Sequence, residues 1–309
     1  MKKYFKLLIA CGLLSSLLLS GQVNNASAAS PVIDMDHTAI QVLVDARKVK
    51  FADAAAYENN GRVMVPFRGI GEALKAKVNY ASNRVTFTGS DKSIQLTLGS
   101  NTATVDGKVV QMDTAAMAKK GRTYVPLRFI SENLGQNVDW DPASRYVWIG
   151  SKNVPTPEEA GIKPVSIDAY KNMMGKSLSD VYAGMKQAYV FSEEDLPLQI
   201  GNHILYDVWK IKQDNLYGVK VRFSSGGGYP FIYFLTANTA NGRFRQDIGG
   251  LRTTNVDGSV TSAYRIIDNA DEELIKDKNY KSLTLSKIDY IGVGGTSNNT
   301  LFLLKNPLK

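Results

Sequence analysis

Apolar and polar residues alternate with a period of two in several short stretches of the chain, and these stretches form two similar blocks. Such alternation is typical of strands with one buried face. Residues 40–51 open the first block; residues 102–112 open the second, with Asp106-Gly107 at their centre, a strong signal for a two-residue hairpin turn. Each block is therefore expected to begin with a β-hairpin. Ala46 stands where the second block has Gly107, so the first turn is expected to differ or to be strained, because alanine resists a positive φ.

The centre of each block repeats at a constant offset of 60 residues. Residues 61–74 and 121–134 share Gly, Arg, Val, Pro, Arg, Ile, Glu and Leu in the same order. Proline favours an extended residue before it and suits the first helical turn, so a strand should end and a helix begin at each proline. The apolar residues that follow are spaced by three and four, which predicts one buried face on a helix of about two turns. The repeated signature consists of Arg62, Pro66, Arg68 and Glu72 in the first block and of Arg122, Pro126, Arg128 and Glu132 in the second.

The end of each helix is followed by further strand patterns. Gly135 is expected to close the second helix as a left-handed cap, and Lys75 occupies that place in the first. The order within each block is then hairpin, helix and hairpin, which predicts one small antiparallel sheet wrapped around a short helix, with a duplicated signature. These later strands are expected at residues 78–80, 84–87, 94–98, 138–140 and 145–149.

The polar residues of the signature are expected to serve the fold. In both copies an arginine precedes a glutamate by four residues, as Arg128 precedes Glu132. An exposed pair of this kind contributes about 0.3–0.5 kcal/mol. Alternatively, the guanidinium holds strand carbonyls near the proline turn, because its donors are fixed in a fork. Trp140 and its aromatic neighbours are expected in core or edge packing, with a carbohydrate-stacking face as the alternative.

The doubled signature, with Val-Asp-Gly before it and Val-x-Trp-Asp after it, resembles the N-terminal (stalk) domain of copper amine oxidases. The resemblance covers about residues 40–150, and the second copy is the better match. It implies an antiparallel sheet curled around a helix, a module found at the front of many secreted bacterial proteins. In that family the catalytic machinery lies in other domains. The resemblance therefore implies a fold for residues 40–150 and no oxidase activity.

Copper amine oxidase chemistry is also opposed by the rest of the sequence. The family implies three histidine ligands for copper and a tyrosine cofactor in an Asn-Tyr-Asp/Glu setting. This chain has two histidines, His37 and His203, and its nearest tyrosine context, at residues 279–281, lacks the acidic residue. Imidazole-rich sites are the rule for copper. We therefore expect no metal site, no cofactor and no catalytic residue.

The first 28 residues are typical of a secretory signal peptide. Three lysines precede the apolar residues 7–19, and the Ala-Ser-Ala at residues 26–28 offers small residues for cleavage. A lipoprotein anchored through Cys11 is the alternative, but cleavage there would leave residues 13–19 on the mature chain. We expect the mature protein to be secreted, and extracellular or associated with the cell wall. No later run reaches the roughly 20 apolar residues that span a bilayer, so no transmembrane segment is expected.

The charge of the chain bears on its partners. Removal of the signal takes three lysines with it and lowers the net formal charge from +8 to +5. This mild excess favours loose, salt-screened association with anionic envelope polymers. No basic run is interleaved with aromatic residues, so nucleic acid is not expected. The expected partner is an anionic cell-wall polymer or another extracellular protein.

The composition changes after residue 150. Residues 151–165 contain three prolines and are expected to link two domains, a stalk-like domain at residues 29–150 and an α+β domain at residues 166–309. The second domain is expected to open with a helix that carries Ile167, Tyr170 and Met174, and to continue as a mainly antiparallel sheet.

Two strand patterns in the C-terminal domain differ in their expected burial. Residues 204–211 are apolar on both faces and should form a central strand. Residues 219–223 alternate, so one of their faces is expected to lie in water. Further strands are expected at residues 230–235, 262–267, 283–290 and 301–304.

These observations favour a secreted bacterial protein without catalytic activity. Its stalk module is expected to bind or space at the cell envelope, while the C-terminal domain binds a ligand or partner. An envelope-directed hydrolase is the alternative, with its carboxylates among Glu193, Asp195, Asp207 and Asp268, because glycosidases need two carboxylates at a defined separation. A secreted protein inhibitor is a third hypothesis.

Overall fold

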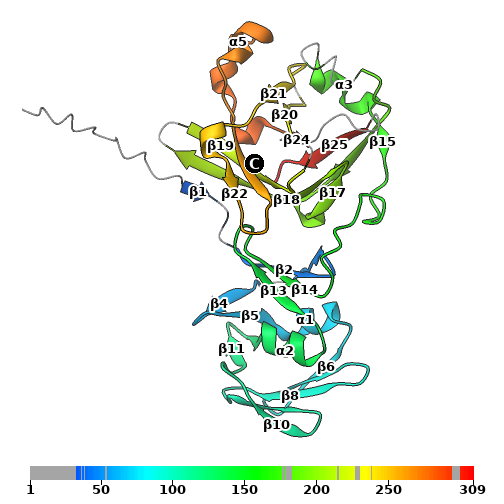
Figure 1. The fold of residues 1–309 in the computed structure, drawn as a ribbon, viewed down its shortest axis with the longest axis vertical. Helices are drawn as coiled ribbons and strands as arrows, with labels where there is room; N and C mark the ends of the chain where they lie inside the picture. The colour runs from blue at the N-terminus through cyan, green and yellow to red at the C-terminus, as the bar shows by residue number, and fades with distance from the viewer. Residues whose placement is uncertain are drawn as a thin grey trace, which may run out of the picture. The chain divides into compact units, whose positions relative to one another are not determined.

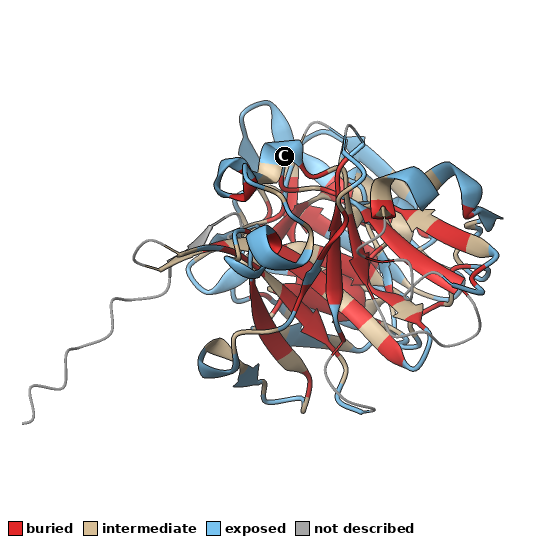
Figure 2. Ribbon diagram, turned by 90° about the horizontal axis from the view of Figure 1, so that it is seen from above, coloured by how far each residue is buried: buried red, intermediate tan, exposed pale blue. Residues whose placement is uncertain are grey.

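The computed structural model describes residues 33–35, 37, 39–52, 54–175, 178, 183–213, 216–226, 230–237, 239–293 and 300–309. The chain divides into two units, Met1–Pro31 and Val32–Lys309. The predicted signal peptide and Cys11 lie outside the described residues, and the fold below is that of the second unit. It consists mainly of sheets with a few short helices (Figure 1), and the buried residues are concentrated along the strands (Figure 2).

The two signature segments form adjacent strands at the centre of one sheet. Val65 pairs with Val125, so the two copies of the repeat run antiparallel to each other about a local two-fold axis. The order in this sheet is β11-β12-β5-β4. Its strands are β4 (Tyr57–Asn59), β5 (Arg62–Pro66), β11 (Met117–Lys119) and β12 (Arg122–Pro126).

A short helix follows each central strand, as the proline and the apolar spacing predict. The helices are α1 (Phe67–Ala73) and α2 (Leu127–Asn133). Ile70 and Ile130, one on each helix, are completely buried. They pack in the same core cluster as Val65 and Val125. The spacing of three and four therefore buries one helical face against the paired strands.

Two further sheets complete this part of the unit. A five-stranded antiparallel sheet has the order β10-β9-β8-β7-β6, and a four-stranded sheet has the order β13-β14-β2-β3. Their strands are β2 (Gln41–Val44), β3 (Arg47–Lys48), β6 (Lys77–Ala81), β7 (Arg84–Thr88), β8 (Ser93–Thr97), β9 (Thr102–Val105), β10 (Lys108–Gln111), β13 (Val138–Asp141) and β14 (Tyr146–Ile149). The expectation of a single antiparallel sheet around one helix was too simple. Strand β2 from the first block pairs in parallel with β14 from the second, so the blocks interlock across the repeat.

The turns of the two blocks have the same backbone conformation despite their different residues. Asp45 and Ala46 have φ of 48° and 60°, and Asp106 and Gly107 have φ of 50° and 81°. The first turn is therefore the strained case of the two alternatives, because Ala46 adopts a left-handed conformation. Ala46 is nevertheless buried in a small cluster with aromatic residues of β14, and this burial offsets part of the strain.

The remaining part of the unit contains two six-stranded sheets. The first joins β1 (Ile33–Met35), β17 (Leu198–Ile200), β18 (His203–Gln213), β19 (Leu216–Phe223), β22 (Thr253–Thr254) and β23 (Val260–Arg265). The second joins β15 (Val165–Ser166), β16 (Gln187–Phe191), β20 (Ile232–Leu235), β21 (Arg243–Arg245), β24 (Tyr290–Val293) and β25 (Thr300–Lys305). All pairings in these sheets are antiparallel except that of β16 with β25.

The helical elements of this part are short. Those with described bounds are α3 (Asp168–Met174), α5 (Ala270–Leu274) and the 3₁₀ turns η2 (Glu193–Asp195), η3 (Gly249–Leu251), η4 (Tyr280–Ser282) and η5 (Leu285–Lys287). The strand expected at residues 283–290 begins only at Tyr290, because η5 occupies its first half. The described residues are thus mostly sheet with few helices, and mostly antiparallel.

Three hydrophobic clusters support this part, and the proline-containing segment contributes to the largest of them. Ala160 and Ile162 pack against this largest cluster between the two sheets. The carbonyl of Pro155 accepts a hydrogen bond of 2.8 Å from the Gln199 backbone. Residues 151–165 are therefore packed against the sheets that follow them. No helix within the described part of the chain is long and apolar enough to cross a membrane.

Candidate functional site

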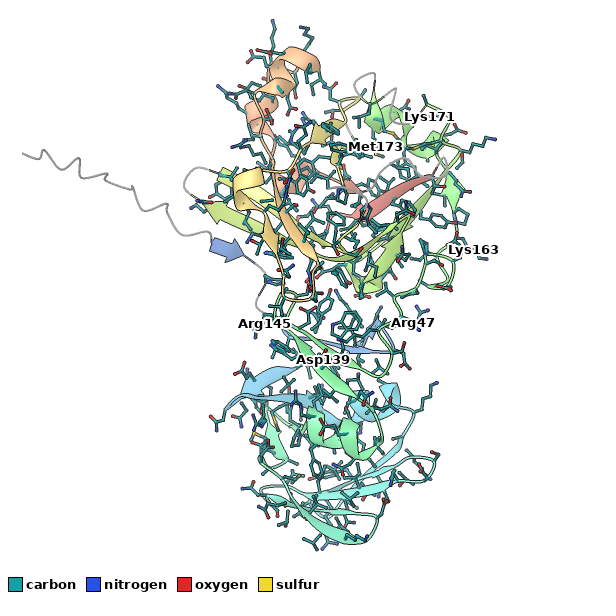
Figure 3. The ribbon with its side chains drawn as sticks, viewed as in Figure 1. Arg47, Asp139, Arg145, Lys163, Lys171 and Met173 are labelled. Carbon is teal, nitrogen blue, oxygen red and sulfur yellow. The ribbon has the colours of Figure 1, made fainter. Side chains whose placement is uncertain are left out.

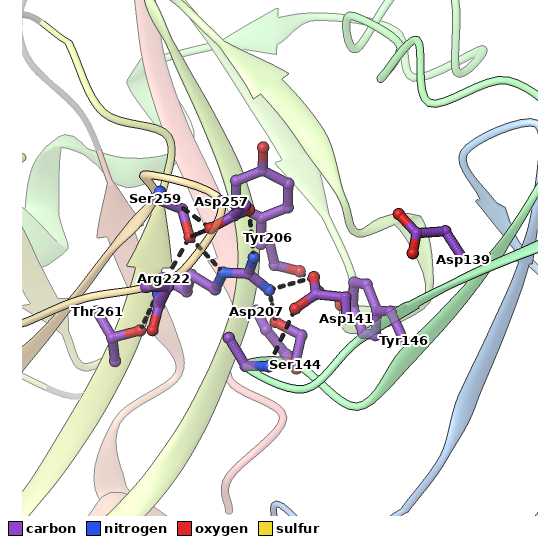
Figure 4. A network of polar contacts seen from close by, with 12 residues as sticks. Asp139, Asp141, Ser144, Tyr146, Tyr206, Asp207, Arg222, Asp257, Ser259 and Thr261 are labelled. Atoms are coloured by element: carbon purple, nitrogen blue, oxygen red, sulfur yellow. Dashed lines mark hydrogen bonds and ion pairs between the residues drawn. The ribbon is translucent and has the colours of Figure 1, made fainter.

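A buried arginine organises the polar contacts between the β13–β14 hairpin and the C-terminal sheet. Arg222 of β19 has no exposed surface. Its Nη1 donates to Asp141 Oδ2 at 2.5 Å and to Ser144 Oγ at 2.8 Å. Its Nη2 donates to Asp257 Oδ2 at 2.7 Å, and its Nε donates to Ser259 Oγ at 2.8 Å (Figure 4). The guanidinium also lies 4.5 Å from the ring centroid of Tyr206. Each of its three nitrogens has a hydrogen-bond partner in Figure 4.

The partners of Arg222 come from segments far apart in the sequence. Asp141 ends β13 and Ser144 lies in the turn after it, whereas Asp257 and Ser259 lie in the turn between β22 and β23. Burial alone would raise the pKa of Asp257, but hydrogen bonds from Ser259 and the charge of Arg222 hold that pKa below its ordinary value. Asp257 is therefore ionised at neutral pH.

Two tyrosines extend the network on the side of the hairpin. Tyr146 of β14 is completely buried, and its hydroxyl donates a 2.6 Å hydrogen bond to the carbonyl of Tyr206. Burial, with a smaller contribution from Asp207, raises the pKa of Tyr146 well above its ordinary value. Burial also raises the pKa of Tyr206. Both phenols therefore stay protonated at neutral pH, and the Tyr146 hydroxyl acts as a donor.

A cavity of about 290 Å³ lies beside this network, and we call it the Trp140 cavity. Aromatic walls are supplied by Trp140, Trp148 and Tyr206, and polar groups by Asp139, Asp141, Lys152, Asn255 and Asp257. Trp140 is 37% exposed, whereas Trp148 is almost fully buried. Asp139 accepts a hydrogen bond from Lys152, and this bond is the main reason that the pKa of the Asp139 carboxyl is lowered. Figure 3 labels Asp139 on β13 and Arg145 in the turn before β14.

A second hollow, of about 620 Å³, lies beside α2, and we call it the α2 groove. The signature residues Arg62, Arg128 and Glu132 line it, and Trp140 lines it as well. Trp140 is therefore shared by the α2 groove and the Trp140 cavity. Arg128 Nε lies 3.9 Å from Glu132 Oε1, and both side chains are mostly exposed. This is the exposed ion pair of the two alternatives weighed for the signature.

The signature residues also make local contacts. The Arg68 guanidinium lies 5.3 Å from the centroid of the Phe67 ring, and Arg62 pairs with Asp113. Pro66 and Pro126 are the residues at which β5 and β12 end and the helices begin. Glu72 is exposed on α1, and Arg122 pairs in β12 opposite Lys119.

The two histidines have different surroundings. The ring of His37 stacks on Trp209, with centroids 4.0 Å apart and an interplanar angle of 13°. Its Nε2 lies 3.4 Å from Asp207 Oδ2. His203 is buried at the start of β18 and meets the edge of Phe223. Within the described residues, no group of three or more His, Cys, Asp or Glu side chains is placed to hold a metal ion.

Three of the carboxylates proposed for a hydrolase are engaged by neighbouring backbone groups. Asp195 accepts hydrogen bonds from the amide and hydroxyl of Ser192, at 2.7 and 2.8 Å. Asp207 accepts from the Val208 amide, and Asp268 accepts from the Ala270 amide, each at 3.0 Å. Glu193 opens η2, and its carbonyl accepts a bond from Lys48. The contacts of Asp195 and Asp268 are capping and turn contacts, the usual role of such residues at the start of a turn or helix, whereas Asp207 lies within β18.

Arg222 was missed at the level of sequence. Its place in the alternating residues 219–223 predicted a face in water, but that face is covered by the β13–β14 hairpin and the turn at residues 255–259. Asp141, Ser144 and Asp257 were missed for the same reason, since each is an ordinary turn residue in sequence. Trp140 was expected in core or edge packing, with a carbohydrate-stacking face as the alternative. The structure places it partly exposed at a cavity, a position that a stacking residue requires.

Residues 43–149 match the family model of the copper amine oxidase N-terminal domain. The match confirms the resemblance and covers the three N-terminal sheets and both signature helices. Residues 150–309 lie outside it. No curated protein matches the chain in sequence.

Proposed function

We propose that this chain is a secreted, non-catalytic bacterial protein that binds at the cell envelope. In this proposal the stalk-type module presents the Trp140 cavity, and the ligand is bound where the β13–β14 hairpin meets the C-terminal sheet. The observation that carries the proposal is this cavity, with its partly exposed tryptophan and polar groups already held in place by Arg222. Small-ligand sites typically combine aromatic walls with a few fixed polar groups.

The geometry of the polar groups favours binding over catalysis. Asp141 and Asp257 both pair with the same buried guanidinium, so each carboxylate is held by a cation. A glycosidase acid, in contrast, needs a raised pKa and a second carboxylate facing it. The pKa of Asp257 is instead lowered.

The test is co-sedimentation of the mature protein with purified bacterial cell wall across a salt series. We expect retention at low salt that falls only in part as salt rises, because the net charge of +5 contributes a screened component and the cavity contributes an unscreened one. No retention at low salt would contradict the proposal. Release of new reducing ends from the wall during the same incubation would favour the hydrolase instead.

A further inference from the structure

The two hollows that share Trp140 suggest the chemical class of the ligand, on the premise that the proposed function is correct. We propose that Trp140, with the Trp140 cavity and the α2 groove on either side of it, binds a chain of uncharged sugar rings.

The aromatic side chains offer flat apolar faces at low entropic cost. Trp140 is 37% exposed, and Tyr206 is half-buried. The Arg222 guanidinium packs against the Tyr206 ring, which limits its motion. Rigid aromatic side chains give large amphipathic contact areas, and a sugar ring presents a matching face of C–H groups.

The charged groups in the Trp140 cavity are already paired inside the protein. Lys152 engages Asp139, and Arg222 engages both Asp141 and Asp257. An ionised carboxylate has about four lone-pair positions, so each of these groups can still accept a hydroxyl hydrogen while it keeps its cation. Sugar hydroxyls need such acceptors and bring no charge that would compete for Lys152 or Arg222.

The same charges give an anionic ligand no special attraction in this place. Three carboxylates line the Trp140 cavity with Lys152, and Arg222 and Arg145, whose guanidinium lies 5.8 Å from the Trp140 ring centroid, add two positive charges, so the formal charges around the cavity cancel. In the α2 groove Glu58, Asp113 and Glu132 outnumber Arg62 and Arg128 by one. An anionic wall polymer would therefore be attracted by the net positive charge of the whole protein but not by the hollows themselves.

The size and arrangement of the hollows indicate a chain rather than a single sugar. The Trp140 cavity, at about 290 Å³, lies at the lower end of the roughly 300–1,000 Å³ usual for ligand sites. Because Trp140 also lines the α2 groove, a ligand stacked on it can continue from one hollow into the other. Affinity should then rise with the number of rings.

The test is titration of the mature protein with soluble uncharged oligosaccharides, chitooligosaccharides and β-glucan oligomers of two to six rings, by calorimetry and tryptophan fluorescence at low and high salt. We expect binding that strengthens with chain length and changes little with salt. Trp140→Ala should weaken it at least roughly tenfold, as expected for a central aromatic contact, and Trp140→Phe should restore part of the loss.

Tyr80→Ala is the matched control. Tyr80 occupies the position of Trp140 in the first copy of the repeat and is similarly exposed, but it lies outside both hollows. This variant should bind as the unchanged protein does. Unfolding curves for Trp140→Ala and Tyr80→Ala establish that both are folded.

The outcomes separate this inference from the proposed function. Failure of every uncharged oligosaccharide to bind, with wall retention intact, would overturn the inference and leave the proposed function standing. Binding that salt abolishes would also overturn it, because uncharged rings stacked on Trp140 offer no charge for salt to screen. Equal losses in Trp140→Ala and Tyr80→Ala would place the contact elsewhere. If the unchanged protein bound neither the cell wall nor any oligosaccharide, both proposals would be contradicted.

Discussion

The guanidinium of Arg222 is completely buried, and four side chains accept its hydrogen bonds. A buried arginine of this kind is tolerated only when its charge is paired and its donors are used. Two carboxylates supply the charge, and two serine hydroxyls accept two further hydrogen bonds. The residue therefore determines how the β13–β14 hairpin is held against β19.

Replacing Arg222 with Met should lower the free energy of unfolding by about 3 kcal/mol, because breaking a buried ion pair leaves an uncompensated charge. Asp141, whose side chain is 13% exposed, would be that charge. Urea denaturation followed by tryptophan fluorescence measures the effect. Arg128→Met is the control, since its pair with Glu132 is exposed, and it should cost less than about 0.5 kcal/mol.

A similar cost for the two variants would show that the Arg222 network is no stronger than a surface pair. Arg222→Lys should recover only part of the stability, because an ammonium lacks the planar fork that reaches four partners. The double variant Arg222→Met with Asp141→Asn should be more stable than Arg222→Met alone, because it removes the stranded carboxylate.

The two signature helices end with the same backbone geometry on different residues. Gly135 has φ of 84° and Lys75 has φ of 56°, and in each case the amide donates to the glutamate carbonyl three residues earlier at 2.9 Å. Both residues are exposed at a left-handed helix cap. The path of the chain after each helix thus requires a left-handed residue at the helix end. Glycine is the residue that adopts this conformation without strain.

Substitutions at this cap position should change the free energy of unfolding in opposite directions in the two copies of the repeat. Gly135→Ala should lower the free energy of unfolding by about 1 kcal/mol, because a non-glycine residue is strained at this φ. No atom lies within 4 Å of the added Cβ, so collision makes no contribution. Lys75→Gly should raise the free energy of unfolding by about 0.5 kcal/mol, since relief of strain exceeds the entropy cost of glycine. Thermal unfolding of the two variants is the measurement, and changes of the same sign would contradict the explanation.

At the scale of whole elements, local patterns were sufficient for the signature strands, the helices and the Asp-Gly hairpin. Each of these depends on residues within a few positions of one another, so the period and the turn chemistry determine it. The pairing of β2 with β14 could not be predicted in this way. These strands are about 100 residues apart, and the local pattern of one strand does not identify the other as its partner.

The whole molecule should be most stable between about pH 5 and pH 10. Several carboxyls have a pKa below the ordinary value, among them Asp139, Glu158 and Asp257. Such groups stabilise the fold above their unfolded pKa, and that contribution is lost as pH falls below about 4.5. A hydrogen bond to Glu158, with burial, raises the pKa of Tyr189 to about 12. This contribution is fully present below pH 10 and is lost as pH rises toward 12.

Chemical denaturation across pH 3–11 measures this profile. Tyr189→Phe should flatten part of the decline above pH 10, because the variant has no phenol to ionise at that position. The rest of the decline above pH 10 should persist in this variant, because burial raises the pKa of Tyr264 as well. A stability that does not change between pH 3 and pH 11 would contradict the prediction.

The sequence by itself determined the duplicated module of the N-terminal part, because strand period, proline-started helices and turn residues act over short distances. It also singled out Trp140, although without saying which of its faces would be open. Only the tertiary structure decided that Arg222 is buried, because burial depends on what covers a face as well as on the pattern along it. The same holds for the cavity, whose walls come from hairpins and turns joined by contacts across 81 residues, as between Asp141 and Arg222. Alternation assigns a side chain to a face of a strand, and the packing of distant segments decides whether that face meets water, protein or ligand.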